Sequence, residues 1–309
     1  MDIFTKFKRS APPEEESLLP VAEKIVREVE KRIKGKRWQI KLMLAVFLAG
    51  GHLLLEDRPG VGKTTLAKTF AQVLDLEFKR IQFTSDLLPS DIIGINYFDL
   101  NLRELKFKKG PIFTEILLAD EINRASPKTQ SGILEAMEER QVTIDGKSYQ
   151  LSPHFFVIAT QNPLEESGTF PLPFSQLDRF MAVTSIGYPD REAERIILKG
   201  EEFPPVESIS REVVEELKRE VKKVKVSDPV VEMVLEIANY TRGKLFKVGL
   251  STRGALGIVE LGKSWAKLHN RDFVIDRDIL DLLPVTLPHR ILPEDPQLDY
   301  LTYLKGKLA

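Results

Sequence analysis

The sequence predicts an α/β protein with a parallel central sheet, followed by a smaller all-α domain. Between residues 53 and 185, short apolar runs alternate with segments of helical periodicity. That alternation is typical of parallel strands joined by helices that cover both faces of the sheet. After residues 188–190 the pattern becomes helical, with Pro and Gly between the segments. We therefore expect an α/β domain at 20–188 and a helical domain at 189–309, preceded by a flexible, Pro- and Glu-containing arm at 1–19.

The individual elements follow from the spacing of the apolar residues. Strands are expected at Leu53–Glu56, Phe78–Gln82, Ile116–Ala119, Phe155–Ala159 and Ala182–Ser185. Helices are expected at 20–34, at 38–49, from about 62 and, in the second domain, at 191–199, 211–223, 228–241, 252–268 and 276–283. Two further stretches alternate apolar and polar residues around a turn, which predicts inserted β-hairpins at Tyr97–Lys108 (around Asn101) and Gln141–Leu151 (around Asp145-Gly146).

The composition favours a globular protein of a reducing compartment. Hydrophobic residues make up 42% of the chain, charged residues 29%, and there is no cysteine, which excludes disulfides and cysteine nucleophiles. The longest apolar stretch, 42–55, is interrupted by Gly50, Gly51 and His52, and it is shorter than the roughly 20 residues that a membrane span needs. We expect a cytoplasmic protein without a membrane span. The formal net charge of −1 gives no general attraction to nucleic acid.

A glycine-containing loop with a lysine follows the first expected strand. It reads Asp57-Arg58-Pro59-Gly60-Val61-Gly62-Lys63-Thr64-Thr65. Glycines let backbone N–H groups approach phosphate oxygens, the lysine supplies a charge for the β- and γ-phosphates, and the Thr64 hydroxyl can bind Mg²⁺. Residues 58–65 therefore predict a nucleoside triphosphate site. The pattern normally begins with Gly, and here Asp57 stands at that position.

Two acids end another expected strand. The apolar run 116–119 leads directly into Asp120 and Glu121, at the carboxyl edge where α/β sheets bind ligands. Asp120 can hold Mg²⁺ through water, and Glu121 can orient and deprotonate an attacking water. The alternative is a pair of solvated acids that cap the next helix.

A third strand ends in polar residues at 160–162. Asn162 follows the apolar run 157–159, and we predict that it positions the attacking water near the γ-phosphate. The alternative is a turn residue, because Asn before Pro commonly begins a turn.

These motifs resemble those of MoxR-type AAA+ ATPases. Residues 57–65 match a Walker A motif, residues 117–121 match Walker B, and the continuations 122–130, 134–142 and 159–163 are similar to the same family. The resemblance extends over about residues 20–292, and Asp at position 57 also occurs in MoxR-like loops. It implies an AAA+ P-loop NTPase core with two inserted hairpins, followed by a helical lid.

The resemblance also assigns roles to three arginines. Arg179 looks like the arginine finger, which reaches the γ-phosphate bound by a neighbouring subunit, where it would offset transition-state charge. Arg253 matches the sensor 2 arginine and is expected to contact phosphates in its own subunit, and Arg124 is a candidate for the interface between subunits. The alternatives are an intrachain ion pair for Arg179 and an ordinary first-turn arginine for Arg253.

Other segments have weaker indications. In relatives, hairpins such as 97–108 and 141–151 line or face a central pore; the alternative is that they are edge strands. Residues 33–36 lie where relatives carry a Val-Gly-Gln-like segment near adenine, and Lys36 replaces the Gln.

The leading hypothesis is therefore an ATPase that uses ATP and Mg²⁺, forms a homo-oligomeric ring (a hexamer by resemblance) and remodels a partner protein in the manner of a chaperone. The partner is a client or a separate protein with a von Willebrand A domain, with which MoxR-like proteins commonly work. The alternatives are an AAA+ nucleic-acid motor, disfavoured by the balanced charge, and a nucleotide-gated scaffold with negligible hydrolysis.

Overall fold

The structure is a computed structural model that describes residues 18–164 and 168–308, so the predicted arm lies almost entirely outside the described residues. The N-terminal part contains α1 (Pro20–Glu30), α2 (Arg37–Leu48), β1 (Leu53–Glu56), α3 (Lys63–Val73), β2 (Phe78–Gln82), α4 (Pro89–Ile93), β3 (Gly94–Asp99), β4 (Glu104–Lys109), β5 (Ile116–Asp120), α5 (Pro127–Glu139), β6 (Gln141–Ile144), β7 (Lys147–Gln150), β8 (Phe156–Gln161), α6 (Phe174–Leu177) and β9 (Ala182–Thr184). The C-terminal part contains α7 (Arg191–Lys199), α8 (Arg211–Lys223), α9 (Asp228–Thr241), β10 (Phe246–Val248), α10 (Thr252–Leu268), α11 (Asp276–Thr286), β11 (Leu292–Pro293) and α12 (Tyr300–Leu308).

The predicted parallel sheet is confirmed. Its strand order is β2-β5-β8-β1-β9, and every neighbouring pair is parallel. All five strands therefore point the same way, so their carboxyl ends share one edge of the sheet and their amino ends share the other. These two edges separate the candidate site residues into two groups.

Helices cover both faces of this sheet, as near-continuous apolar strands predict. Alternate strand residues belong to different cores: Leu53 and Leu55 pack with α1, α2 and α3, whereas Leu54 packs with α5 on the other face. Helix α8 and one side of α10 and α11 join the first of these cores.

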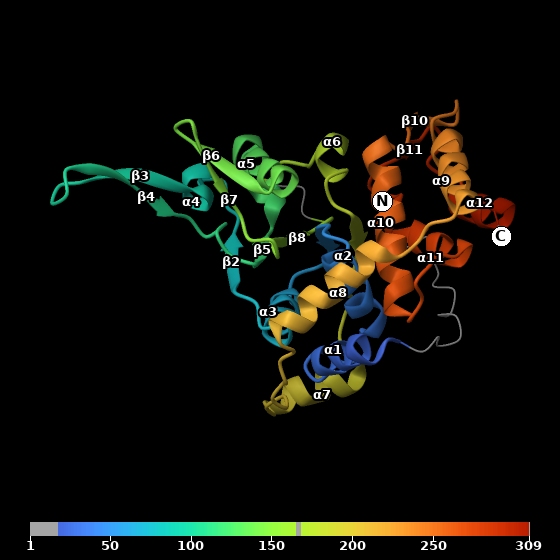
Figure 1. Cartoon of the computed structure of the whole chain (residues 1–309), viewed down its shortest axis with the longest axis horizontal. Helices are drawn as coiled ribbons and strands as arrows, with labels where there is room; N and C mark the ends of the chain where they lie inside the picture. Colours follow the sequence, from blue (N-terminus) through green and yellow to red (C-terminus); the bar gives the residue numbers. More distant parts are fainter. Residues whose placement is uncertain (1–17, 165–167, 309) are drawn as a thin grey trace.

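Both predicted hairpins are present, and the first is longer than expected. Strands β3 and β4 form an antiparallel arm that extends well away from the body of the molecule (Figure 1). Strands β6 and β7 pair antiparallel through Asp145 and Gly146, both at positive φ, as a tight hairpin turn requires. The two hairpins touch where Phe107 packs on Tyr149, with ring centroids 4.3 Å apart.

The C-terminal part is built on helices α9 to α12, which share a third apolar core. One short antiparallel pair, β10 with β11, lies among these helices. The side of α10 that faces the N-terminal part packs on α2, where Trp265 lies 6.4 Å from Trp38 between ring centroids. Among the described residues, no helix is both long and apolar enough to cross a membrane.

Candidate nucleotide site

The phosphate loop joins the carboxyl end of β1 to the start of α3. Gly60 and Gly62 both have positive φ, 83° and 92°, which side chains rarely tolerate, and a Cβ at Gly60 would meet no atom within 4 Å. The backbone at Gly60 is therefore open to an approaching ligand. The Lys63 ammonium lies inside the loop, where it donates to the carbonyl oxygens of Asp57 (3.0 Å) and Arg58 (3.3 Å). A phosphate in the loop would offer this ammonium a charged acceptor instead.

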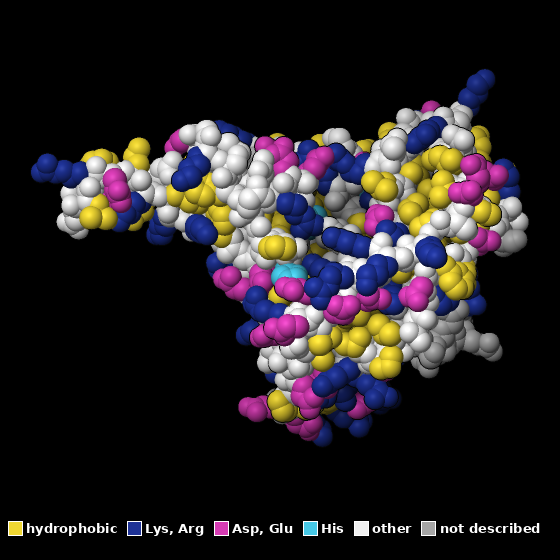
Figure 2. Space-filling view, in the orientation of Figure 1, with side chains coloured by type: hydrophobic (Ala, Val, Ile, Leu, Met, Phe, Trp, Pro, Cys, Tyr) yellow, Lys and Arg dark blue, Asp and Glu magenta, His cyan; other side chains and the backbone are white. Residues whose placement is uncertain are grey.

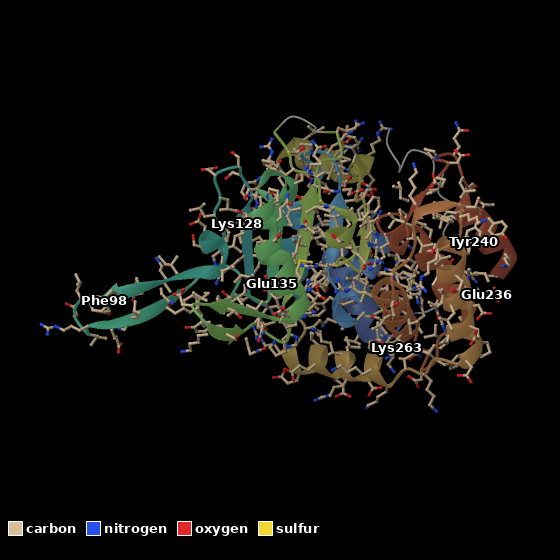
Figure 3. All side chains as sticks on the ribbon, turned by 90° about the horizontal axis from the view of Figure 1, so that it is seen from above. Phe98, Lys128, Glu135, Glu236, Tyr240 and Lys263 are labelled. Carbon is tan, nitrogen blue, oxygen red and sulfur yellow. The ribbon has the colours of Figure 1, made fainter. Side chains whose placement is uncertain are left out.

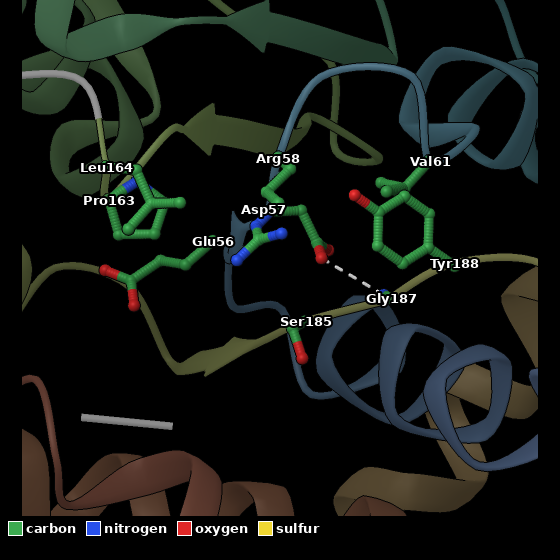
Figure 4. Close-up of a pocket in the computed structure, with 9 residues that line it drawn as sticks. All are labelled: Glu56, Asp57, Arg58, Val61, Pro163, Leu164, Ser185, Gly187 and Tyr188. Atoms are coloured by element: carbon green, nitrogen blue, oxygen red, sulfur yellow. Dashed lines mark hydrogen bonds between the residues drawn. The ribbon is translucent and has the colours of Figure 1, made fainter. Parts of the chain in front are cut away.

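Asp57 explains the departure of the loop from the common pattern. It is not among the residues with positive φ, so its backbone does not require glycine. Its carboxylate is buried and accepts the backbone N–H groups of Ile186 (2.5 Å) and Gly187 (3.1 Å), just after β9 (Figure 4). Burial raises the pKa of Asp57, and the two N–H groups oppose that shift. The side chain thus ties the start of the phosphate loop to the segment that leads into α7.

A small pocket adjoins this loop. Val61, Tyr188, Ser185 and Pro163 are among the residues that line it (Figure 4). The predicted base-binding segment lies next to the loop, because a Cβ on Gly62 would come within 3.9 Å of Ile33 Cδ1. Lys36, which replaces the Gln of relatives, is buried and donates to the Tyr188 carbonyl at 2.6 Å.

The two acids lie at the carboxyl end of β5, and polar neighbours hold both. Asp120 Oδ1 accepts from the Thr160 hydroxyl at 2.6 Å, and Oδ2 accepts from Arg80 Nη2 at 2.6 Å. Glu121 has a left-handed backbone (φ 57°, ψ 49°), and its carboxylate accepts from Gln82 Nε2 at 2.7 Å.

Asp120 and Glu121 therefore lie together, and Arg80 and Arg124 partly offset their negative charges. Arg124 Nε lies 3.3 Å from Glu121 Oε2, so this arginine pairs within the chain. Glu121 is the N-cap of the short 3-10 helix Ile122–Arg124 but makes no capping hydrogen bond with its side chain, and Ser126 is the N-cap of α5.

Asn162 lies just beyond the end of β8, the strand between β5 and β1. Its Oδ1 accepts the backbone N–H of Leu164 at 3.2 Å, which is an Asx turn and matches the alternative considered for this residue. It also lines a second pocket together with Asn123 and Gln161. Its position after the strand beside β5 and its turn role are compatible, because the turn bond uses only the amide oxygen.

Sequence reasoning missed Thr160, Arg80 and Gln82. Thr160 is a fully buried polar residue at the end of an apolar strand, and that position was the available signal. Arg80 and Gln82 are two residues apart on β2, so they share one face of an edge strand beside β5. The same pattern is typical of a solvated face, so it does not by itself indicate a site.

Arg179 and Arg253 lie at the opposite edge of the sheet. Arg179 lies three residues before β9, at the amino end of that strand. Glu138 lies near the amino end of β1, because the carbonyl of the preceding residue, Met137, is 3.1 Å from Nε2 of His52, the residue before β1. Glu138 contacts both arginines: Oε2 is 3.3 Å from Arg179 Nε, and Oε1 accepts from Arg253 Nη2. A four-residue strand spans about 13 Å, so neither guanidinium lies beside the phosphate loop of the same chain.

Comparisons with known proteins identify the family to which this fold belongs. Residues 52–182 match the family model described as ATPase family associated with various cellular activities (AAA), and residues 242–301 match an AAA lid domain. The uncharacterized protein YeaC of Bacillus subtilis is 45% identical over 284 residues, covering 90% of this chain and 89% of that protein. Chaperone MoxR1 of Mycobacterium tuberculosis is 38% identical over 283 residues, covering 87% of this chain and 75% of that protein.

A solved structure of a protein from Cytophaga hutchinsonii, assigned as an ATPase, superposes with a TM-score of 0.84. It is 36% identical and covers 93% of this chain and 92% of that one. The chain belongs to the MoxR family of AAA+ ATPases.

The expected contact of Arg253 with phosphates in its own subunit stays a prediction. In this MoxR-family chain, Arg253 pairs with Glu138 at the amino edge of the sheet. The reason is the docking of the helices after residue 241: Ser251, the N-cap of α10, donates to Asp178 Oδ2 at 2.7 Å and thereby fixes Arg253 next to Arg179.

The donors at the carboxyl edge suit MgATP. Thr64 and Asp120 supply the hydroxyl and carboxylate oxygens that Mg²⁺ prefers, and a bound Mg²⁺ would supply positive charge for the phosphate oxygens. Asp120 is 7% exposed, and its acceptors face Arg80 and Thr160, so the carboxylate is ordered for such a role.

Proposed function

We propose that this chain hydrolyses ATP at sites shared between neighbouring subunits of a homo-oligomeric ring. Residues 58–65 bind the phosphates, Thr64 and Asp120 hold Mg²⁺, and Glu121 activates the attacking water with help from Asn162. Arg179 and Arg253 of the next subunit complete the site. The ring is a hexamer by resemblance to the family.

The separation of the two groups of residues along the sheet carries this proposal. The phosphate loop and the acids occupy the carboxyl edge, whereas Arg179 and Arg253 occupy the amino edge. A subunit that presents complementary halves of one site at opposite edges forms head-to-tail contacts, and such contacts give a ring when the rotation between subunits closes. Positive charge at the γ-phosphate then depends on assembly.

Mixing two inactive variants tests the shared site. Lys63→Ala removes the phosphate-loop ammonium, and Arg179→Ala removes the finger, so each protein alone is expected to hydrolyse ATP poorly. In a one-to-one mixture, about a quarter of the interfaces pair an intact loop with an intact finger, so about a quarter of the wild-type turnover should return. A mixture as inactive as its components, or an Arg179→Ala protein with wild-type turnover, would contradict the proposal.

We further infer that the hydrolysis cycle remodels a partner protein. The β3–β4 arm supports this inference, because Phe98 and three leucines are more than half exposed along it: Leu100, Leu102 and Leu105. Figure 3 shows Phe98 near the end of the arm, and Figure 2 shows apolar side chains there beside lysines and arginines. Exposed apolar side chains on a projecting element are typical of a protein-contact surface.

The partner is either a client or a separate protein with a von Willebrand A domain. Glu121→Gln should bind ATP without hydrolysing it and thereby retain the partner during affinity purification. The matched control is the same variant with Leu100, Leu102 and Leu105 changed to Ser. Equal recovery of the same partner by both proteins would exclude the arm as the contact surface.

A further inference from the structure

Glu138 holds both arginines of the amino edge with one carboxylate. One oxygen lies 3.3 Å from Arg179 Nε, and the other accepts from Arg253 Nη2. The three side chains remain partly accessible, with exposed fractions of 38% for Glu138, 27% for Arg179 and 47% for Arg253. The cluster is therefore open on one side, and the carboxylate occupies the position between the two guanidinium groups.

The position of Glu138 on its helix is not explained by helix stability. It lies in the last turn of α5, which contains no basic residue. A negative charge there is unfavourable, because the helix dipole places partial negative charge at that end. The two arginines offset this cost and provide a reason for a carboxylate at this position.

A second observation indicates that the donors of Arg179 are not fully satisfied. Arg179 Nε is buried and makes no hydrogen bond with any described residue, despite its closeness to the carboxylate. Arg179 is nevertheless held firmly, because its neighbour Asp178 accepts from Ser251 at 2.7 Å and from Arg290 Nε at 2.9 Å. A second anion with a different geometry would satisfy this donor.

We propose that Glu138 is an internal substitute for the γ-phosphate, a positioning residue that holds Arg179 and Arg253 in the unassembled subunit and releases them when a neighbour presents ATP. This proposal rests on the shared site described above. Because the carboxylate and a γ-phosphate carry charge of the same sign, they repel each other, and one must leave before the other binds. Assembly is thereby coupled to nucleotide: a neighbour without a γ-phosphate cannot displace the carboxylate.

The test is the dependence of ATP hydrolysis on subunit concentration. In Glu138→Gln, the side chain that holds Arg179 and Arg253 loses its charge, so assembly should require a lower protein concentration. Because the variant lacks two partly exposed ion pairs that assembly must otherwise break, the half-activating subunit concentration should decrease about fivefold. Glu135→Gln, one turn earlier on the same helix and exposed (Figure 3), is the matched control and should not change that concentration. Glu138→Asp, which keeps the charge, should stay close to the wild type.

A second measurement follows assembly without turnover. Sedimentation velocity with MgATP should show that Glu121→Gln/Glu138→Gln associates at about fivefold lower concentration than Glu121→Gln. An unchanged or higher association concentration would overturn the proposal, as would a loss of maximal turnover in Glu138→Gln with an unchanged half-activating concentration. Failure of the shared site is distinguishable, because turnover per subunit of the wild type would then not depend on its concentration.

Discussion

The Asp57 carboxylate provides the sharpest test of how the phosphate loop is held. Changing Asp57 to Gly would restore the residue that the common loop pattern carries at this position. The structure nevertheless predicts that Asp57→Gly destabilises the protein, because the backbone does not need glycine there and the carboxylate accepts two N–H groups.

The size of the stability loss in Asp57→Gly follows from the two backbone N–H groups that lose their acceptor. The Ile186 N–H lies in a buried environment, and leaving such a donor unpaired costs roughly 1–3 kcal/mol. The Gly187 N–H is only partly buried, so water can replace most of its bond. Removal of the carboxylate relieves the burial penalty that raises the pKa of Asp57, whereas the added glycine costs roughly 0.5–1 kcal/mol of chain entropy. The free energy of unfolding should fall by about 2 kcal/mol in total.

Urea unfolding followed by tryptophan fluorescence measures this loss, because both tryptophans, Trp38 and Trp265, contact the core that also contains β1. Asp75→Gly is the control: Asp75 has a φ of 54° and an exposed side chain, so glycine there should be neutral or slightly stabilising. If Asp57→Gly were no less stable than Asp75→Gly, the two N–H groups would not depend on the carboxylate, and the reasoning would be refuted.

Two further predictions concern other polar groups in the fold. Thr160→Val should lower kcat about tenfold with little change in KM, because Asp120 and the Glu121 N–H lose a shared partner, whereas Thr160→Ser should retain activity in the same steady-state assay. The pKa of Lys218 is lowered to about 7, mainly by burial and then by the charge of Arg140, so between pH 7 and 10 the unfolded chain binds a proton that the folded chain lacks. Stability should therefore rise with pH across this window, and this contribution is lost by about pH 7, below which both states carry the proton. The rise should be less than about 1 kcal/mol per pH unit, because the Phe47 ring, 3.9 Å from the ammonium, favours the charged form. Urea midpoints measured from pH 7 to 10 should lose this slope in Lys218→Met and keep it in the control Lys225→Met, because Lys225 is exposed and does not contribute to the pKa shift of Lys218.

The inner strands of the sheet were predictable because they are buried on both faces, whereas the edge strand β2 exposes Arg80 and Gln82. The run Ile116–Ala119 contains no polar residue, and the strand predicted there differs from the observed strand β5 by one residue. The phosphate loop and the acids were predictable for a related reason, since each follows a strand end at a spacing that few other sites share. The domain boundary at 188–190 stays a prediction, and α8 and parts of α10 and α11 pack with the N-terminal core.

The position of Arg253 was not predictable from local sequence. It depends on contacts between residues far apart in the chain: Ser251 with Asp178, 73 residues earlier, and Arg290 with the same carboxylate, 112 residues apart. No periodicity or spacing reports such contacts, because each partner alone resembles an ordinary cap or surface charge. The resemblance to relatives identified the arginine but not the edge of the sheet at which it lies.

The buried contacts of Asp178 connect these observations. Arg290 is almost fully buried, and burial lowers its pKa to about 10 while Asp178 opposes that shift, so it stays charged at neutral pH. Its Nη2 donates to the Phe180 carbonyl at 2.7 Å, one residue beyond Arg179. The segment that carries Arg179 is thus held on α10, which carries Arg253, and on the turn after α11, which carries Arg290. Because these contacts are buried and charge-assisted, the two arginines should move as one unit with those helices, and a displacement of the helices would change both arginines of a shared site together.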